Sequence, residues 1–465
     1  MKIFMSALFL MAVANTVSAG ETDVKSTDTL MPYNAAGKWG FVARDAARVE
    51  FALAPIYELA YPFRNGRAAV RQNKPWGFID DKGTVVIPFQ YDDVQSGIFR
   101  SGVAIVKKAN RYGVIDRDGK ELLPCTFKSI FLDEKEVRLI ASIDNPADPA
   151  DFSGLNGLYD LTGKLLMPHE YTHIYPQFKG GVTAVEIKGK HALASSTGQL
   201  LTPLQYQQIL HSDITHFIAV KEKELGTDVY DEHGKLLFSA PYPYVGTLVD
   251  NRASYKDPAT KLFGYLDSEG KIAIVAQFVL SGKFSEGLAI VQRKTGGDVE
   301  AIDTAGNSMG TVPNAFIRLD KFNNGHVWLA DRTDKKVYLY NRRLEKVFPQ
   351  GFYYAADFDA NGLARAQAVA KLNGLINMKG EWVVQPEWTL IEASSVPGQY
   401  IVSKDREKGI VNATGQTLFK PQAVSISKWD EQFVKIARAG FFSGNDYHCL
   451  WRHDGVVFYN AKKPE

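Results

Sequence analysis

The fold is decided by a five-residue stretch that returns along the chain, Ile79-Asp80-Asp81-Lys82-Gly83. Two clear further copies are Ile115-Asp116-Arg117-Asp118-Gly119 and Leu266-Asp267-Ser268-Glu269-Gly270. The final glycine recurs about every 36 residues, and a fixed period of this size marks a repeat architecture. It stands at Gly83, Gly119, Gly163, Gly198, Gly234, Gly270, Gly306, Gly380, Gly415 and Gly455. Leu344 fills one vacant slot and Ala46 fits a degenerate first copy, which gives twelve units.

Each unit reads as three strands, with the tight turn between the second and the third. In one clear unit we expect strands at residues 103–106, 111–116 and from 121 onward. The aspartate can accept a hydrogen bond from the backbone two residues on, and glycine tolerates the positive φ of a G1 bulge. We therefore interpret the motif as structural turns at Asp80, Gly83, Asp116, Gly119, Asp160, Gly163, Asp231, Gly234, Asp267, Gly270, Asp303 and Gly306.

Two further residue types recur in register with the turn. Proline interrupts the third strand at Pro88, Pro124, Pro168, Pro203 and Pro386, so that strand must lie at an edge or bend there. A glycine opens the second strand at Gly40, Gly77, Gly113, Gly157, Gly264, Gly374 and Gly409, which indicates a bulge or a close backbone approach. An aromatic residue usually follows the proline, and we expect it to fill the space between units. The sequence predicts an all-β array of antiparallel hairpin or meander repeats, superhelical or propeller-like.

The first nineteen residues have the pattern of a secretory signal. Lys2 precedes an apolar run from Phe4 to Val13, which is shorter than the roughly 20 residues of a membrane-spanning helix. A small-residue site then predicts cleavage near Ala19, and hence an exported protein that is periplasmic or secreted. We expect a short linker over residues 20–35 and the repeat array over 36–465, with an atypical or capping last unit.

Charge and cysteine content narrow the function classes. The formal net charge is +2, from 54 basic and 52 acidic residues that are intermixed, so we expect no nucleic-acid partner. Cys125 and Cys449 are the only cysteines. They fall in the third and last units, and whether they pair depends on whether the array is open or closed, because a disulfide needs Cα atoms within about 7 Å. Two buried thiols are the favoured interpretation.

Together, several positions resemble the bacterial WG-repeat family. They are Trp76-Gly77-Phe78-Ile79-Asp80, Gly83, Val86-Ile87-Pro88 and Gln90-Tyr91-Asp92. The resemblance is strong from Ala36 to about Val137 and around Phe263 to Gln277, and weaker elsewhere. It implies an exported or surface-associated repeat protein without a common chemistry, and it supplies no catalytic residues.

One string matches the zinc signature H-E-x-x-H, His169-Glu170-Tyr171-Thr172-His173. That chemistry needs both histidines on one helical turn, whereas Pro168 and the repeat register place the string in a strand. In a strand, residues four apart are separated by about 13 Å, too far for one zinc ion. We therefore expect no metal, no cofactor and no catalytic residues.

Interruptions of the period are where a binding surface is expected. The last unit holds an insertion with an adjacent aromatic pair, Phe441 and Phe442, which we take as a candidate contact surface or as part of a cap. The leading hypothesis is an exported, non-enzymatic binding or scaffold protein of the cell envelope, with protein or glycan partners. The alternative is an envelope polysaccharide-processing enzyme with a carboxylate site built from loops.

Overall fold

The structure is a computed structural model. It describes residues 29–35, 37–43, 50–135, 137–148, 154–176, 178–211, 216–222, 225–317, 321–369, 371–394, 396–428, 433–438, 449–452 and 457–459. Within these residues the only helix is the single 3-10 turn η1 (Gln95–Gly97), and every other element is a strand. The same residues contain no helix that is long and apolar enough to cross a membrane. The predicted all-β class is confirmed.

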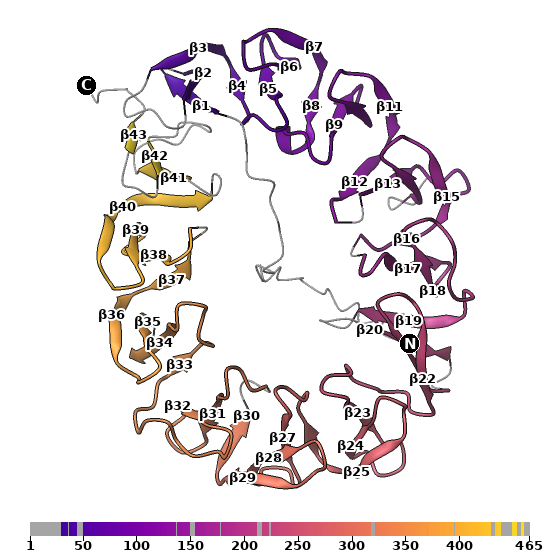
Figure 1. Ribbon diagram of the computed structural model, residues 1–465, viewed down its shortest axis with the longest axis vertical. Coiled ribbons are helices and arrows are strands. Elements are labelled where there is room, and N and C mark those ends of the chain that lie inside the picture. The colour runs from indigo at the N-terminus through magenta and orange to yellow at the C-terminus, as the bar shows by residue number, and fades with distance from the viewer. Residues whose placement is uncertain are drawn as a thin grey trace, which may run out of the picture.

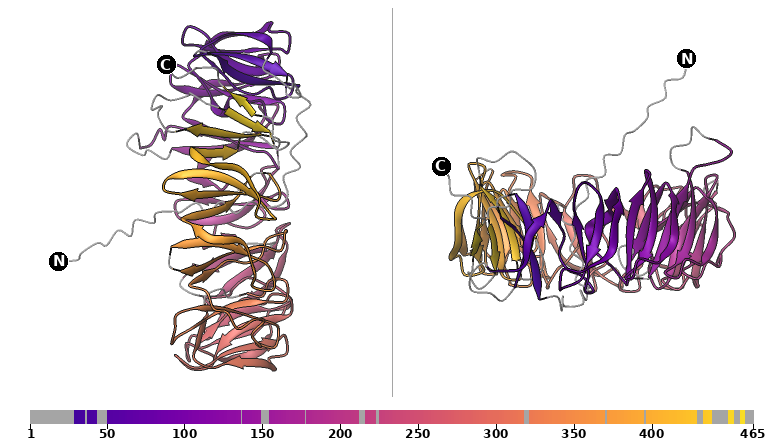
Figure 2. Two further views of the ribbon diagram at one scale, coloured as in Figure 1. Left: turned by 90° about the vertical axis from the view of Figure 1, so that its left-hand side faces the viewer. Right: turned by 90° about the horizontal axis from the view of Figure 1, so that it is seen from above.

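The strands form ten antiparallel sheets that follow one another along the chain. Two of these sheets have seven strands and each spans two repeats, so the ten sheets hold twelve units. Figure 1 shows the units arranged one after another around a single open centre, with β40–β43 beside β1–β3. Figure 2 shows the same arrangement edge-on as a band. In the described residues the sheets remain separate, and no closed sheet forms.

The units share one plan of three or four consecutive strands. Units one to three comprise β1 (Leu30–Ala35), β2 (Lys38–Ala43) and β3 (Phe51–Tyr57); β4 (Leu59–Ala60), β5 (Ala68–Arg71), β6 (Trp76–Ile79) and β7 (Val85–Tyr91); β8 (Asp93–Val94), β9 (Val103–Lys108), β10 (Arg111–Asp116) and β11 (Glu121–Phe127). Units four to six comprise β12 (Ser129–Asp133), β13 (Arg138–Ile143), β14 (Leu155–Asp160) and β15 (Leu165–Tyr171); β16 (His173–Ile174), β17 (Val182–Ile187) and β18 (Lys190–Ser195); β19 (Tyr206–His211), which serves both units, β20 (His216–Lys221), β21 (Thr227–Asp231) and β22 (Leu236–Ala240).

The remaining units have the same plan. Units seven to nine comprise β23 (Ala253–Lys256), β24 (Phe263–Leu266) and β25 (Ile272–Phe278); β26 (Leu280–Ser281), β27 (Leu288–Gln292), β28 (Val299–Asp303) and β29 (Ser308–Val312); β30 (Ala315–Ile317), β31 (Val327–Asp331) and β32 (Val337–Tyr340). Units ten to twelve comprise β33 (Tyr354–Ala355), β34 (Ala364–Val369), β35 (Leu372–Ile376) and β36 (Trp382–Trp388); β37 (Leu390–Ala393), β38 (Gln399–Lys404) and β39 (Glu407–Asn412); β40 (Thr417–Lys428), which serves both units, β41 (Phe433–Arg438), β42 (Cys449–Arg452) and β43 (Val457–Tyr459).

Most units hold one strand more than the sequence predicts. A short strand, such as β4 or β8, pairs with the predicted first strand and lies nearest the open centre in Figure 1. We call it the inner strand, and we call the last strand of a unit, such as β7 or β11, the outer strand. The inner strands escape prediction because two paired residues are too few to show an alternating pattern.

The predicted start of the array at residue 36 needs a correction. Strand β1 (Leu30–Ala35) lies within the stretch assigned to a linker and pairs along its length with β2. Its side chains are mostly buried, and Met31 is fully enclosed. The array therefore begins at Leu30 at the latest, because a strand that is buried and paired in a sheet is part of the core.

Eleven hydrophobic clusters form the core, one for each junction between consecutive units. At junction 2/3, which joins units two and three, Phe78 and Tyr91 of one unit pack with Phe99 and Val106 of the next. Tyr91 follows the strand proline, so the expected role of that aromatic residue in filling the space between units is confirmed here. A single unit cannot bury its own apolar faces, which is why the chain folds as a stack of neighbours.

Candidate functional site

The predicted turn motif forms hairpin turns in the structure. Asp80 Oδ1 accepts hydrogen bonds from the backbone N–H groups of Lys82 at 3.0 Å and Thr84 at 2.8 Å. The Gly83 N–H donates to the Asp80 carbonyl at 3.0 Å, and Gly83 has φ 82°. A positive φ also occurs at the equivalent Gly119, Gly163, Gly198, Gly234, Gly270, Gly306, Gly380 and Gly415. The turn carboxylates of Asp80, Asp116, Asp160, Asp231, Asp267 and Asp303 each accept hydrogen bonds from the backbone of their own turns.

One turn aspartate illustrates the electrostatics of the set. Asp303 Oδ2 accepts a hydrogen bond from the Asn307 side-chain amide at 2.9 Å, and Oδ1 accepts from the backbone N–H groups of Asn307 and Ala305. The Asn307 side chain and these backbone donors hold the pKa of Asp303 below its usual value. Asp303 therefore stays charged at neutral pH, which suits a turn acceptor rather than a general acid.

The turn glycine also fits against the preceding unit. A Cβ atom on Gly119 would lie 3.2 Å from Ile87 on the outer strand of unit two, and one on Gly306 would lie 3.4 Å from Ile274. Leu344, which fills the vacant slot in the period, keeps the left-handed conformation with φ 58°. The outer strand that faces it carries Gly310, where a Cβ would lie 3.3 Å from Leu344 Cβ. At this junction the glycine lies on the outer strand and the larger side chain lies in the turn. The close contact between the turn of one unit and the outer strand of the other is therefore preserved.

The strand glycines are explained by a bulge. A Cβ on Gly77 would lie 2.7 Å from the Ile87 carbonyl oxygen, and the pairing of β6 with β7 shifts at this point, opposite Pro88. Two units without this glycine lack the shift, because Asp228 pairs regularly with Ser239 and Glu300 with Thr311. Where a residue with a side chain replaces this glycine, the second strand therefore pairs with the outer strand without a bulge at this position.

Asp228 is the centre of a buried polar cluster that the sequence did not predict. It is 6% exposed and accepts hydrogen bonds from the Tyr206 hydroxyl at 2.9 Å and Ser239 Oγ at 2.6 Å. The Lys221 ammonium lies 2.7 Å from Oδ1. Burial is the main cause that raises the pKa of the Tyr206 hydroxyl, so it remains a donor at neutral pH. Since its acceptors are satisfied, this cluster stabilises unit six and is not a binding site.

The apparent zinc signature is divided between two strands. His169 lies on β15, where Nε2 is 2.8 Å from the Tyr159 hydroxyl and Nδ1 is 3.2 Å from the Leu155 carbonyl oxygen. His173 lies on β16, where Nδ1 is 3.1 Å from Glu186 Oε2. The two rings have different partners. Each ring is accounted for by hydrogen bonding within its own unit, and the His169 ring also stacks at 5.9 Å on Phe127 of unit three.

The two cysteines and the predicted aromatic contact pair are described to different extents by the structure. Cys125 is a free, half-buried thiol on β11, and burial raises its pKa. Cys449 lies on β42, and its side chain is outside what the structure describes. Phe441 and Phe442, the candidate contact surface, lie outside the described residues.

The inner strands carry a regular row of side chains. One inner-strand position comes directly before a residue that is buried in most units. In units three to six it is polar, occupied by Asp93, Ser129, His173 and Gln208. In units eight to eleven it is apolar or aromatic, occupied by Leu280, Phe316, Tyr354 and Leu390; unit seven has no inner strand, and Tyr244 takes the equivalent place before the isolated bridge of Val245 with Tyr255. Tyr244 is 50% exposed, Leu280 37% and Phe316 36%. We call these five residues the inner apolar row.

A second inner-strand position, directly after the buried residue, differs between junctions 2/3 and 3/4. It holds Tyr61, Gln95 and Phe131 in units two, three and four. The register follows from the preceding residues, which pair as Ala60 with Val70, Val94 with Val106 and Ile130 with Ala141. At junction 2/3 the Tyr61 ring lies 5.3 Å from the Trp76 ring. A Cβ on Gly97 would lie 2.0 Å from Tyr61, so η1 closes directly over this ring.

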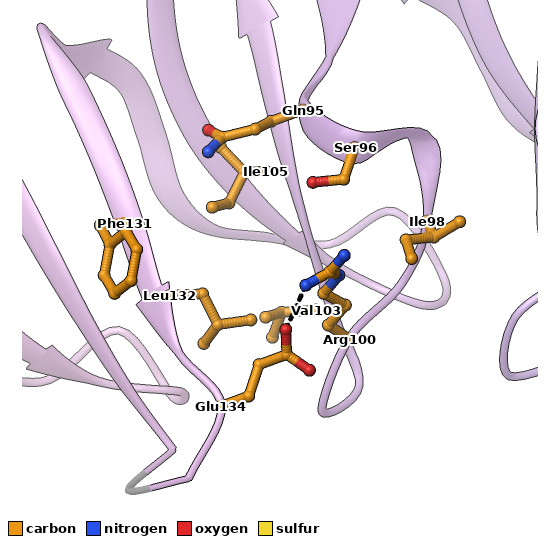
Figure 3. Close-up of a pocket in the computed structure, with 9 residues that line it drawn as sticks. All are labelled: Gln95, Ser96, Ile98, Arg100, Val103, Ile105, Phe131, Leu132 and Glu134. Atoms are coloured by element: carbon orange, nitrogen blue, oxygen red, sulfur yellow. Dashed lines mark hydrogen bonds and ion pairs between the residues drawn. The ribbon is translucent and has the colours of Figure 1, made fainter. Parts of the chain in front are cut away.

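At junction 3/4 the same position is Gln95, and a pocket of about 180 Å³ is present. It is lined by Gln95, Ser96, Ile98, Arg100, Val103, Ile105, Phe131, Leu132 and Glu134 (Figure 3). Arg100 and Glu134 form an ion pair across the pocket. The side chains of Gln95 and Ser96 make no hydrogen bond within the part of the chain that the structure describes. The pocket thus combines an apolar wall, a neutral charge pair and two free polar groups.

Comparison with known proteins now adds to this geometry. The family model described as "WG containing repeat" matches residues 50–74, 76–112, 112–135, 157–190, 263–294 and 374–395. The chain therefore contains WG repeats. The six matches cover the units in which Gly77, Gly113, Gly157, Gly264 and Gly374 open the second strand. Apart from residues 50–74, which precede Gly77, each matched segment begins at one of these glycines or one residue before it. No curated protein matches the chain.

Solved structures show only weak similarity to this chain. A crystal structure of a eukaryotic initiation factor has 11% identity and a TM-score of 0.31, covering 70% of this chain and 96% of that chain. Hsv2p from Kluyveromyces lactis has 12% identity and a TM-score of 0.29, covering 50% and 89%. AztD from Citrobacter koseri has 13% identity and a TM-score of 0.26, covering 69% and 91%. Similarities at this level carry no conclusion about the function of this chain.

Proposed function

We propose that this protein is an exported, non-enzymatic binding or scaffold protein of the cell envelope, which holds protein or glycan partners on its inner strands. The observation that carries the proposal is the inner apolar row. One strand position is apolar in five successive units, whereas it is polar in the four units before them.

The inner apolar row suits a binding surface because its residues recur at the same position in successive units. The five residues occupy equivalent places on successive units, so the apolar position repeats once in each of five consecutive units. Aromatic and aliphatic groups in the middle of an interface supply most of its binding energy. Repeat proteins use such extended surfaces for recognition. Because this position is polar in units three to six and apolar in units seven to eleven, we expect a partner to be held mainly by units seven to eleven.

Export is supported by the N-terminal sequence. The charged Lys2, the apolar run and the small residues Val17-Ser18-Ala19 have the order of a secretory signal. N-terminal sequencing of the protein recovered from cell fractions tests this step. We expect a mature chain that begins at Gly20 in the exported fraction, and recovery of a full-length chain in the cytoplasm would contradict it.

Binding is tested with two triple serine variants, one in the inner apolar row and one on the outer strands. One replaces Tyr244, Leu280 and Phe316 of the inner apolar row with serine. The control replaces Leu236, Ile272 and Val275 with serine, since these outer-strand residues are exposed by 47%, 52% and 63%. Both variants and the unchanged chain are incubated with purified envelope polysaccharide and with envelope protein extract, and the retained material is identified. We expect the row variant to lose the retained component and the control to keep it; equal retention by both variants would refute the inner surface.

A further inference from the structure

The pocket at junction 3/4 exists because unit three departs from its neighbour at one position. In unit two that position is Tyr61, whose ring lies in the hydrophobic core of junction 2/3 under the turn at Gly97. In unit three Gln95 stands there, with a shorter side chain that leaves about 180 Å³ open between η1 and β12. The space is therefore a hollow at junction 3/4, at the place where the Tyr61 ring packs in junction 2/3.

The size of the pocket limits what it can hold. Its volume of about 180 Å³ corresponds to roughly six water molecules at about 30 Å³ each. Pockets for drug-sized ligands have volumes of about 300–1,000 Å³. A single six-membered ring with its substituents fits this space, whereas a dinucleotide or a lipid chain does not.

The chemistry of the lining separates an apolar wall from a polar mouth. Val103 and Ile105 are buried, at 4% and 7% exposure, and Leu132 completes the wall with them. The Gln95 amide offers two N–H donors and one acceptor, and the Ser96 hydroxyl offers both functions. Neither group has a partner within the described residues, so both are free to bind a ligand.

The charges on the lining cancel. Arg100 and Glu134 face each other as an ion pair, and both side chains are nearly half exposed. An anionic ligand would have to compete with the Glu134 carboxylate for the guanidinium, and a cationic ligand would have to compete with Arg100. The remaining N–H groups of Arg100 and the second oxygen of Glu134 can still bond neutral hydroxyl groups. The pocket thus favours a neutral ligand rich in hydroxyls.

We propose that the pocket at junction 3/4 binds one neutral pyranose ring, either as a free monosaccharide or as the end of an envelope glycan. A pyranose has an apolar C–H face, which suits Val103, Ile105 and Leu132. Its hydroxyls each donate and accept, which suits Gln95, Ser96 and the Arg100–Glu134 pair. The proposal rests on the proposed binding function and names a ligand class for it.

The test measures binding of the methyl glycosides of glucose, galactose, mannose and N-acetylglucosamine by saturation-transfer NMR. The unchanged chain is compared with Gln95→Tyr, which copies the filled junction of unit two. Leu210→Tyr is the matched control, because Leu210 holds the equivalent position in unit six, after the pair Ile209 and Ala219. We expect at least one glycoside to bind, Gln95→Tyr to weaken it at least about tenfold, and Leu210→Tyr to leave it within about twofold.

Three outcomes would overturn the proposal: no binding of any of the four glycosides, binding that Gln95→Tyr leaves unchanged, or equal loss in both tyrosine variants. A second variant, Glu134→Gln, covers the case in which Gln95→Tyr does not fold; it keeps the shape of the pocket and removes the charge pair, and unchanged affinity in it would also count against the proposal. A reducing disaccharide of the bound sugar separates the two sources, since a glycan end requires that the second ring be tolerated. Failure of sugar binding with continued loss of partner in the inner-row variant would leave the proposed function intact.

Discussion

Junctions 2/3 and 3/4 are built from equivalent strands, and the residue that follows the buried inner-strand residue differs between them. Tyr61 fills the first junction and is covered by η1, whereas Gln95 leaves the second one hollow. The turn that covers one junction also supplies Ser96 and Gln95 to the next. A repeat protein can therefore gain a site by losing one filling side chain, because the neighbouring units hold the surrounding backbone in place.

The largest effect is expected for Gly97→Ala. The new Cβ would lie 2.0 Å from Tyr61, and Gly97 has φ 66°, which is unfavourable for alanine. Overpacking and the left-handed backbone together should destabilise junction 2/3 by about 3 kcal/mol. Hydrogen exchange of the β8 and β9 amides measures this locally, and we expect exchange faster by about a hundredfold.

The control for this prediction is the double variant Gly97→Ala with Tyr61→Gln, which gives junction 2/3 the residue of junction 3/4. Removing the ring relieves the overlap, so about half of the lost protection should return. If the loss of exchange protection in the double variant equals the sum of the losses in the two single variants, the Tyr61–Gly97 contact does not set the stability of this junction.

A smaller effect is expected for Tyr61→Ala. Tyr61 packs 5.3 Å from Trp76 and is only partly buried, so the loss should be about 2 kcal/mol, below the cost of removing a fully enclosed aromatic ring. The same exchange measurement applies, with an increase at junction 2/3 and none at junction 3/4. An equal increase at both junctions would show that they are not independent.

Filling the hollow junction should change stability least among the core substitutions. In Gln95→Tyr the added ring enters existing space against Val103 and Leu132, so we expect a change within about 1 kcal/mol of the unchanged chain. Urea unfolding followed by tryptophan fluorescence measures it. A loss comparable to that of Gly97→Ala would mean that the pocket cannot accept the ring, and that Gln95 and Tyr61 are not equivalent.

The smallest effect concerns the backbone of η1. Ser96 has φ 61°, a conformation that glycine adopts without penalty. Ser96→Gly should therefore raise the stability of the turn by up to about 1 kcal/mol, reduced by the greater freedom of glycine in the unfolded chain. Slower exchange at η1 is the expected result, and faster exchange would show that the Ser96 side chain supports the turn.

Much of the backbone structure of the repeat units could be predicted from the sequence. The Asp-to-Gly turn, the strand glycine and the strand proline each follow from local backbone geometry, as Asp80, Gly77 and Pro88 illustrate. Even Leu344 can be assigned to a turn on the period alone, although its compensation by Gly310 appears only when two units are in contact.

The pocket could not be predicted, because Gln95 and Glu134 come together only through the stacking of units three and four. A signal was nevertheless present in the sequence. At the position after the buried inner-strand residue, unit two has Tyr61 and unit four has Phe131, whereas unit three has a glutamine. This position can be aligned only once the short inner strands are known.

The central claim is that the missing aromatic ring at Gln95 creates a sugar site at junction 3/4. Crystals of the mature chain, soaked with the methyl glycoside that shows the strongest saturation transfer, test this claim directly. The account predicts density for one pyranose ring with its C–H face on Val103 and Ile105 and its hydroxyls within hydrogen-bond distance of Gln95 and Ser96. Density for the ring elsewhere on the molecule, or water alone in the pocket, would contradict it.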